Sequence, residues 1–162
     1  MSILLPRPKP VDQPSVTEKR MLLPLVAIRE GVVFPHTEAV LTFGRPKSVA
    51  GIEAAFKSNR YVVFVTQKNS NVDEPSEADF YRVGTLCTIE RTLKTDREIN
   101  ALVKGIARVR LEYLKVEDPY MLTEVTQIPE IQEESDEMKA LVNHVTGEFR
   151  KAVNLGKSVE FL

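Results

Sequence analysis

Few residues in this chain of 162 have side chains suited to covalent chemistry. Its one thiol is Cys87, and its two imidazoles are His36 and His144. Nucleophilic catalysis needs a nucleophile, a base and an orienting group that lie together. Cys87 falls in an apolar run, where a buried thiol is expected, whereas His36 follows a proline at a turn and His144 falls in a predicted helix. Nothing in this spacing brings the three together or matches a zinc site, so we expect no catalytic and no metal-binding residues.

Two other patterns resemble ligand sites without completing them. Leu155-Gly156-Lys157-Ser158 ends like a phosphate-binding loop, but Lys151 stands where that loop needs its first glycine. A calcium loop needs a central glycine, which is absent among the acidic residues Glu130, Glu133, Glu134, Asp136 and Glu137. We interpret those acidic residues as a solvated linker and helix start, and we expect no cofactor in this segment.

Basic residues gather on or near a predicted long hairpin, which raises the question of nucleic-acid binding: Arg91, Lys94, Arg97, Lys104, Arg108 and Arg110. Acidic residues are interleaved with them, and no stacking aromatic residues alternate with them. The formal net charge of −1 gives no electrostatic preference for nucleic acid or for anionic lipid. RNA binding is therefore kept only as an alternative.

Composition limits the class of protein. A hydrophobic content of 43% and a length of 162 residues suit one globular domain with an appended element. A single cysteine excludes an internal disulfide and fits a reducing compartment. No apolar run approaches the roughly 20 residues that span a bilayer, and the first residues lack the features of a signal peptide. We expect a cytoplasmic protein without membrane partners.

Most of the chain between residues 21 and 128 has the pattern of β-strands. Strands are predicted at 22–28, 38–43, 61–66, 82–93, 98–111 and 120–128. Residues 99–111 alternate strictly between apolar and mostly polar side chains, which indicates a strand with one buried face. Residues 82–93 are apolar on both faces, so we expect that strand to be central. Pro24 donates no backbone hydrogen bond, so its strand should lie at an edge or begin after it.

Two helices are predicted. The first covers 46–58, because Pro46 suits the first helical position and Asn59 is a plausible left-handed stop. The second begins after Ser135, a good N-cap, and carries an apolar stripe at helical spacing: Met138, Leu141, Val142, Val145, Phe149, Ala152 and Val153. The stripe continues past Gly156 to the end of the chain, so 129–162 should be the truncated start of a helical region. Residues 1–20 contain four prolines and should be a disordered leader.

Five blocks in the same order resemble one family, the N-terminal domain of Lon ATP-dependent proteases. They are the run 21–35, Arg45-Pro46-Lys47-Ser48, Tyr61–Lys68, Asp79–Thr85 and Val103–Arg110. The resemblance covers about residues 21–128. It implies a mainly β (α+β) fold: a six-stranded PUA-like pseudo-barrel with one inserted helix, followed by a separate C-terminal helix. The hairpin turn at 94–98 departs from the family because it lacks glycine, which favours a type I turn or a longer loop.

The resemblance also implies a role. Such a domain recognises unfolded or damaged proteins for a homohexameric serine protease that uses ATP and Mg²⁺. That family's ATPase loop and serine–lysine pair do not occur in these residues, so we expect no enzymatic activity, and a monomer or weak oligomer. A standalone Lon-type adaptor or receptor is the main alternative, and an RNA-binding PUA-like barrel is the second.

The candidate substrate-binding residues follow from side-chain type and position. Phe34, Pro35 and His36 form a turn that a simple core does not require. Tyr81, Tyr113 and Tyr120 are amphipathic residues of the type favoured at interfaces, although each tyrosine alone also suits core or boundary packing.

Overall fold

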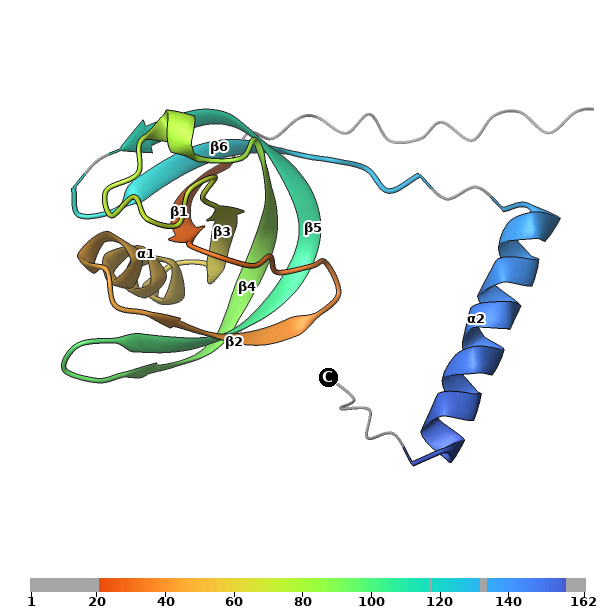
Figure 1. The fold of residues 1–162 in the computed structure, drawn as a ribbon. Coiled ribbons are helices and arrows are strands. Elements are labelled where there is room, and N and C mark those ends of the chain that lie inside the picture. The colour runs from red at the N-terminus through yellow and green to blue at the C-terminus, as the bar shows by residue number, and fades with distance from the viewer. Residues whose placement is uncertain (1–20, 117, 132–133, 157–162) are drawn as a thin grey trace, which may run out of the picture.

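The computed structural model describes residues 21–116, 118–131 and 134–156 of the chain. Within these residues, six strands, two α-helices and one short 3₁₀ turn follow one another (Figure 1). In chain order they are β1 Met21–Ile28, β2 Glu38–Phe43, α1 Pro46–Lys57, β3 Tyr61–Thr66, the 3₁₀ turn Glu77–Asp79, β4 Val83–Lys94, β5 Ile99–Val116, β6 Met121–Gln127 and α2 Asp136–Asn154. The predicted set of strands and helices is therefore confirmed, with bounds that differ by a few residues.

The six strands form one sheet that closes on itself. Their order is β2-β5-β4-β3-β1-β6, and β5 also pairs with β6. All neighbouring pairs are antiparallel except β1 with β3. Closure is possible because β5 is 18 residues long: its first part pairs with β2 and its last part with β6. Five strands thus make a barrel, and β2 extends it along one half of β5. The predicted pseudo-barrel is confirmed.

Alternating side chains of the strands build two apolar cores. On β3, Val63 and Val65 point into the barrel, while Val62 and Phe64 point to the side covered by α1. α1 closes the second core with Ile52 and Ala55, both without exposed surface. This division explains why residues 82–93 are apolar on both faces, and the strand order confirms that β4 lies centrally, between β3 and β5.

The expectation for Pro24 is wrong. Pro24 lies within β1, which runs between two neighbours, and pairs with Leu122 of β6. The parallel pairing with β3 begins one residue later, at Leu25. Pro24 therefore has a strand on one side only, so its missing N–H leaves the second ladder intact.

The prediction of a left-handed residue after α1 named the wrong residue. The left-handed residue is Arg60, with φ of 67°, rather than Asn59. Asn59 instead accepts a hydrogen bond from the Tyr61 N–H through its side chain, at 3.0 Å. The Arg60 N–H donates a hydrogen bond to Ala55 O at 2.9 Å, and the Arg60 guanidinium lies 4.9 Å from the centre of the Phe56 ring, within the range of a cation–π contact.

Strand β5 extends beyond the predicted end at residue 111, to Val116. A register shift between Leu111 and Tyr113 reverses the inward and outward positions, so the alternation in the sequence stops while the strand continues. The hairpin between β4 and β5 closes with a hydrogen bond from Thr95 N–H to Glu98 O of 2.8 Å. Neither residue between them has a positive φ, which agrees with a turn that needs no glycine.

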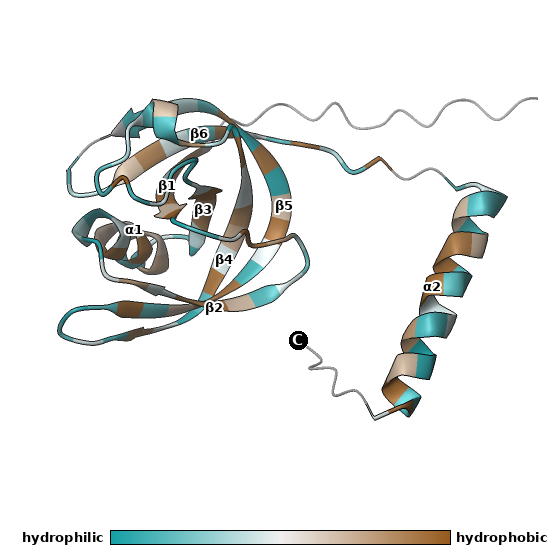
Figure 2. Ribbon diagram, in the orientation of Figure 1, coloured by the Kyte–Doolittle hydropathy of each residue, from teal (hydrophilic) through white to brown (hydrophobic). Residues whose placement is uncertain are grey.

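Helix α2 is capped but uncovered. The Ser135 hydroxyl accepts a hydrogen bond from Met138 N–H at 3.0 Å, as its predicted N-cap role requires. The helix ends at Asn154, before Gly156 with φ of 78°. None of its residues is buried, it stands clear of the barrel in Figure 1, and apolar residues recur along it in Figure 2. The predictions for the leader and for residues 157–162 lie outside the described residues.

Candidate functional site

An apolar groove of about 480 Å³ lies between the loop that joins β1 to β2 and the start of β4. Four of its side chains are large, apolar and exposed: Val32 by 58%, Phe34 by 64%, Tyr81 by 53% and Val83 by 49%. Among the described residues that line the groove, one is cationic, Arg108. Clustered exposed apolar side chains of this kind mark interaction sites more often than singly scattered ones do.

Buried contacts fix the loop side of this groove. Val33 is only 4% exposed and anchors the loop in the second core. The Thr85 hydroxyl donates a hydrogen bond of 2.6 Å to Val33 O, and the Thr66 hydroxyl donates one of 2.7 Å to Gly31 O. With Val33 held inward, the side chains on either side of it are directed to solvent.

The loop also rests directly on the backbone of β5. His36 N–H donates to Gly105 O at 2.9 Å, and Gly105 N–H donates to Thr37 O at 2.8 Å. A Cβ atom at position 105 would lie 2.1 Å from Phe34 O, so no other residue fits there without moving the loop. At this contact between the loop and β5, His36 adopts a left-handed φ of 63°.

The opposite side of the groove is equally constrained. Phe80 is buried in the barrel, so its neighbour Tyr81 faces outward, and Tyr81 N–H donates to Thr66 O at 3.3 Å. A Cβ atom at Gly84 would lie 2.5 Å from Phe64 O. Backbone contacts therefore leave the main chain at both rims of the groove little freedom to move. These contacts fix the outward direction of the apolar side chains.

The structure brings three of the six predicted substrate-binding residues together: Phe34, Pro35 and Tyr81 line the groove. His36 lies next to them in the chain, with its Nε2 atom 3.4 Å from a carboxylate oxygen of Glu130. The other two tyrosines lie elsewhere. Tyr113 is 51% exposed on β5, and the half-buried Tyr120 lies beside Gly51 of α1, whose added Cβ would be 3.6 Å from the tyrosine Cβ.

Sequence reasoning missed Val32 and Val83. Each stands two residues from a groove residue that it did identify, Phe34 and Tyr81, and shares that residue's outward face. The period-two signal was present. Alternation alone does not show which of the two sets of side chains faces solvent. The burial of Val33 and Phe80 in the structure shows that their neighbours face outward.

The residues with reactive side chains do not form a site. Cys87 is fully buried, and burial raises the pKa of its thiol from near 9.0 to about 12. His144 is exposed on α2. Within residues 21–116, 118–131 and 134–156, no group of three or more His, Cys, Asp and Glu side chains is placed to hold a metal ion. No helix of that same part is long and apolar enough to cross a membrane.

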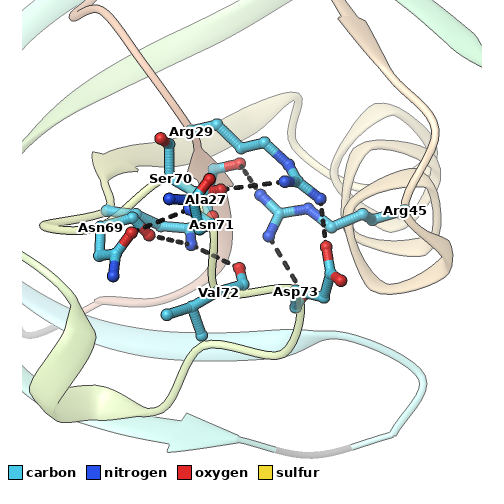
Figure 3. Close-up of polar contacts among 9 residues, drawn as sticks. Ala27, Arg29, Arg45, Asn69, Ser70, Asn71, Val72 and Asp73 are labelled. Carbon is cyan, nitrogen blue, oxygen red and sulfur yellow. Dashed lines mark hydrogen bonds and ion pairs between the residues drawn. The ribbon is translucent and has the colours of Figure 1, made fainter.

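A polar cluster near the start of α1 has a structural explanation (Figure 3). Arg29 donates to a carboxylate oxygen of Asp73 at 2.6 Å and to Ser70 O at 2.9 Å. Arg45 donates to Asp73 O and to Ala27 O. Partial burial, followed by the nearby charge of Arg29, lowers the pKa of Arg45 from its ordinary value. The two guanidinium groups tie the loop after β3 to β1 and α1.

Comparison with known proteins identifies a family. The family model described as the ATP-dependent protease La (LON) substrate-binding domain matches residues 22–162. The Lon protease of Desulforamulus reducens is 36% identical over 138 residues, which cover 85% of this chain and 17% of that protein. The Lon protease of Azorhizobium caulinodans is 35% identical over 156 residues, which cover 95% of this chain and 18% of that protein. The chain thus spans less than a fifth of the length of these relatives.

Solved structures show the same fold. The N-terminal domain of the Mycobacterium avium complex Lon protease superposes with a TM-score of 0.61 at 20% identity, over 83% of this chain and 72% of that one. The Lon N-terminal domain protein from Xanthomonas campestris gives a TM-score of 0.57 at 16% identity, over 77% of this chain and 70% of that one.

Proposed function

This chain belongs to the ATP-dependent protease La (LON) substrate-binding domain family, and on that premise we propose that its apolar groove binds unfolded or misfolded polypeptide for proteolysis. The observation that carries the proposal is the set of four exposed apolar side chains around one groove, on rims held by side-chain and backbone hydrogen bonds. A folded protein keeps its apolar segments inside, so the groove selects for unfolded chains.

The size of the groove implies weak binding of any one segment. Fully burying a large apolar side chain is worth about 1.5–3 kcal/mol, and these side chains are already about half covered. Each therefore adds about 1 kcal/mol, and the loss of freedom of a flexible client offsets much of that sum. Weak, sequence-tolerant contact suits a domain that must release its client to a motor.

We propose that the motor and the cleavage site lie in the rest of a longer Lon-type chain. ATP and Mg²⁺ would bind in that part of the chain. The contacts that build a hexamer would also lie there, so this segment alone would be a monomer or a weak oligomer. A standalone adaptor that delivers clients to a separate protease uses the same groove, and the mass of the native protein in its cells separates the two arrangements.

The groove is tested by fluorescence anisotropy with a labelled, permanently unfolded protein such as a reduced and alkylated model protein. The variant Phe34→Ser removes the most exposed groove side chain. The matched control is Leu93→Ser, because Leu93 is 67% exposed on the β4–β5 hairpin and does not line the groove. We expect Phe34→Ser to weaken binding about fivefold, the loss of about 1 kcal/mol, and Leu93→Ser to leave it unchanged.

Two results would contradict the proposal. Equal affinity for the native and the unfolded form of the same model protein would remove the mechanism, since only the unfolded form exposes apolar segments. Equal weakening by the two serine variants would mean that the groove is not the site. Salt-sensitive binding of RNA without binding of unfolded protein would favour the RNA-binding alternative instead.

A further inference from the structure

Strand β2 is an edge strand beside an otherwise closed barrel. It pairs with β5 on one side, whereas each strand of the ring has a neighbour on both sides. Helix α1 packs on β1, β3 and β4. Within the described residues, the outer edge of β2 therefore has no strand against it.

The register fixes which backbone groups lie on that outer edge. Gly105 N–H donates to Thr37 O at 2.8 Å, so Thr37 and Gly105 form a hydrogen-bonded pair. Pairs alternate along an antiparallel ladder, so Ala39, Leu41 and Phe43 direct their N–H and C=O groups to β5. Glu38, Val40 and Thr42 direct theirs outward.

The far side of β5 supports the same assignment. Thr95 N–H donates to Glu98 O at 2.8 Å, which makes residues 95 and 98 a hydrogen-bonded pair. Alternation from this pair places Asn100 and Leu102 in hydrogen-bonded pairs with β4. Residues 99, 101 and 103 of β5 are then free to bond β2, as the first assignment requires.

Beyond the charged Glu38 at its start, this edge lacks the usual protection against strand addition. Exposed edges normally carry proline, lysine, a bulge or an inward charge. From Ala39 to Phe43 there is no charge and no proline, and Val40 is 69% exposed. A polar cleft of about 770 Å³ runs beside the end of β2, lined by Leu41–Gly44 on one side and Ile28–Glu30 on the other.

We propose that the outer edge of β2 pairs with an extended segment of a client polypeptide, which adds a strand to the sheet. Outward N–H and C=O groups recur at every second residue, a spacing of about 7 Å that another extended backbone matches. Main-chain pairing does not depend on the client's sequence, and it requires a segment free of its own secondary structure. The inference rests on the proposed function and adds a second contact to the groove.

Amide hydrogen exchange followed by NMR tests the pairing directly on the 162-residue chain. In the free protein, the amides of Ala39, Leu41 and Phe43 should exchange slowly, and those of Glu38, Val40 and Thr42 rapidly. A saturating amount of the unfolded model protein should slow the second set at least tenfold and leave the first set unchanged. Unchanged exchange at all three outward amides in the complex would overturn the proposal.

A pair of variants gives an independent readout. Val40→Pro removes an outward N–H and crowds the edge without breaking a bond to β5, while Val40→Thr keeps the N–H and the branched shape. We expect Val40→Pro to weaken client binding by roughly three- to tenfold and Val40→Thr to leave it unchanged. Circular dichroism checks the fold of Val40→Pro, and if that variant unfolds the exchange pattern of the unmodified chain decides.

The outcomes separate the two proposals. If Phe34→Ser weakens binding and Val40→Pro does not, the strand pairing is wrong and the groove stands. If the unmodified chain binds no unfolded protein, both are wrong. If the outward amides are protected in concentrated chain without any client, and dilution releases them, the edge pairs with a second copy, which overturns the assignment to a client.

Discussion

Helices α1 and α2 both carry an apolar stripe, but only one of them buries it. In α1, Ile52 and Ala55 have no exposed surface and pack against the outer side of the barrel strands. In α2, Leu141 and Val145 are 53% and 64% exposed, and no residue of the helix is buried. The same periodicity therefore marks a core element in one case and an uncovered face in the other. Periodicity predicts a helix and its apolar side, and tertiary contacts decide what that side does.

The largest difference between the two helices should appear in truncations of their apolar stripes. Ile52→Ala leaves a cavity in a closed core and should lower the free energy of unfolding by about 2–5 kcal/mol. The matched change Leu141→Ala on α2 should alter it by less than about 0.5 kcal/mol, because the side chain is already in water. Urea denaturation followed by circular dichroism measures both. Similar losses for the two variants would mean that α2 is part of the cooperative core.

Local patterns were enough to place most elements. The predicted bounds of β2 and β3 coincide with those observed, because each strand has its own alternation or apolar run between turn residues. Ser135 was identified as a cap because its hydrogen bond spans only three residues. In each of these cases the physical cause lies within a few residues of its effect.

Features that depend on distant residues were not predictable in this way. Pro24 is tolerated inside β1 because β3 begins its pairing one residue later. Arg60 takes the left-handed position that Asn59 was expected to fill, and its carbonyl accepts a hydrogen bond from the distant Ile89 N–H at 2.9 Å. Tyr113 has the residue type of the groove tyrosine but stands on another part of the barrel.

A buried thiol in the core should make the stability of the protein sensitive to alkaline pH. The pKa of Cys87 is raised to about 12 by burial, so the thiolate forms first in the unfolded chain, near pH 9.0. The stability that the folded state gains by keeping the Cys87 thiol protonated is fully present below about pH 9. It is then lost at about 1.4 kcal/mol per pH unit as the pH rises toward 12.

Subtraction isolates the contribution of that thiol. The unfolding free energies of the unmodified chain and of Cys87→Ala, measured by urea titration at several pH values, share the ionisation of lysines and tyrosines. Their difference should shrink as pH rises above 9, because only the unmodified chain loses the thiol contribution. Parallel curves would show that the thiol is not held in its protonated form.

As a contrast on α2, His144→Cys in the Cys87→Ala chain should react with a thiol reagent at once in the folded state.

The smallest effect on the barrel should come from the N-cap of α2, because none of the described residues buries any part of that helix. Ser135→Ala removes the hydroxyl that accepts the Met138 N–H and should cost the helix about 1 kcal/mol. Since no α2 residue is buried, this loss should appear as reduced helical content near 222 nm, with the unfolding midpoint of the barrel unchanged. Ser135→Asp keeps an acceptor at the cap and adds a charge that the helix dipole favours, so it should retain the helical signal. A lower barrel midpoint in Ser135→Ala would mean that α2 stabilises the barrel, and the distinction between the two helices would no longer hold.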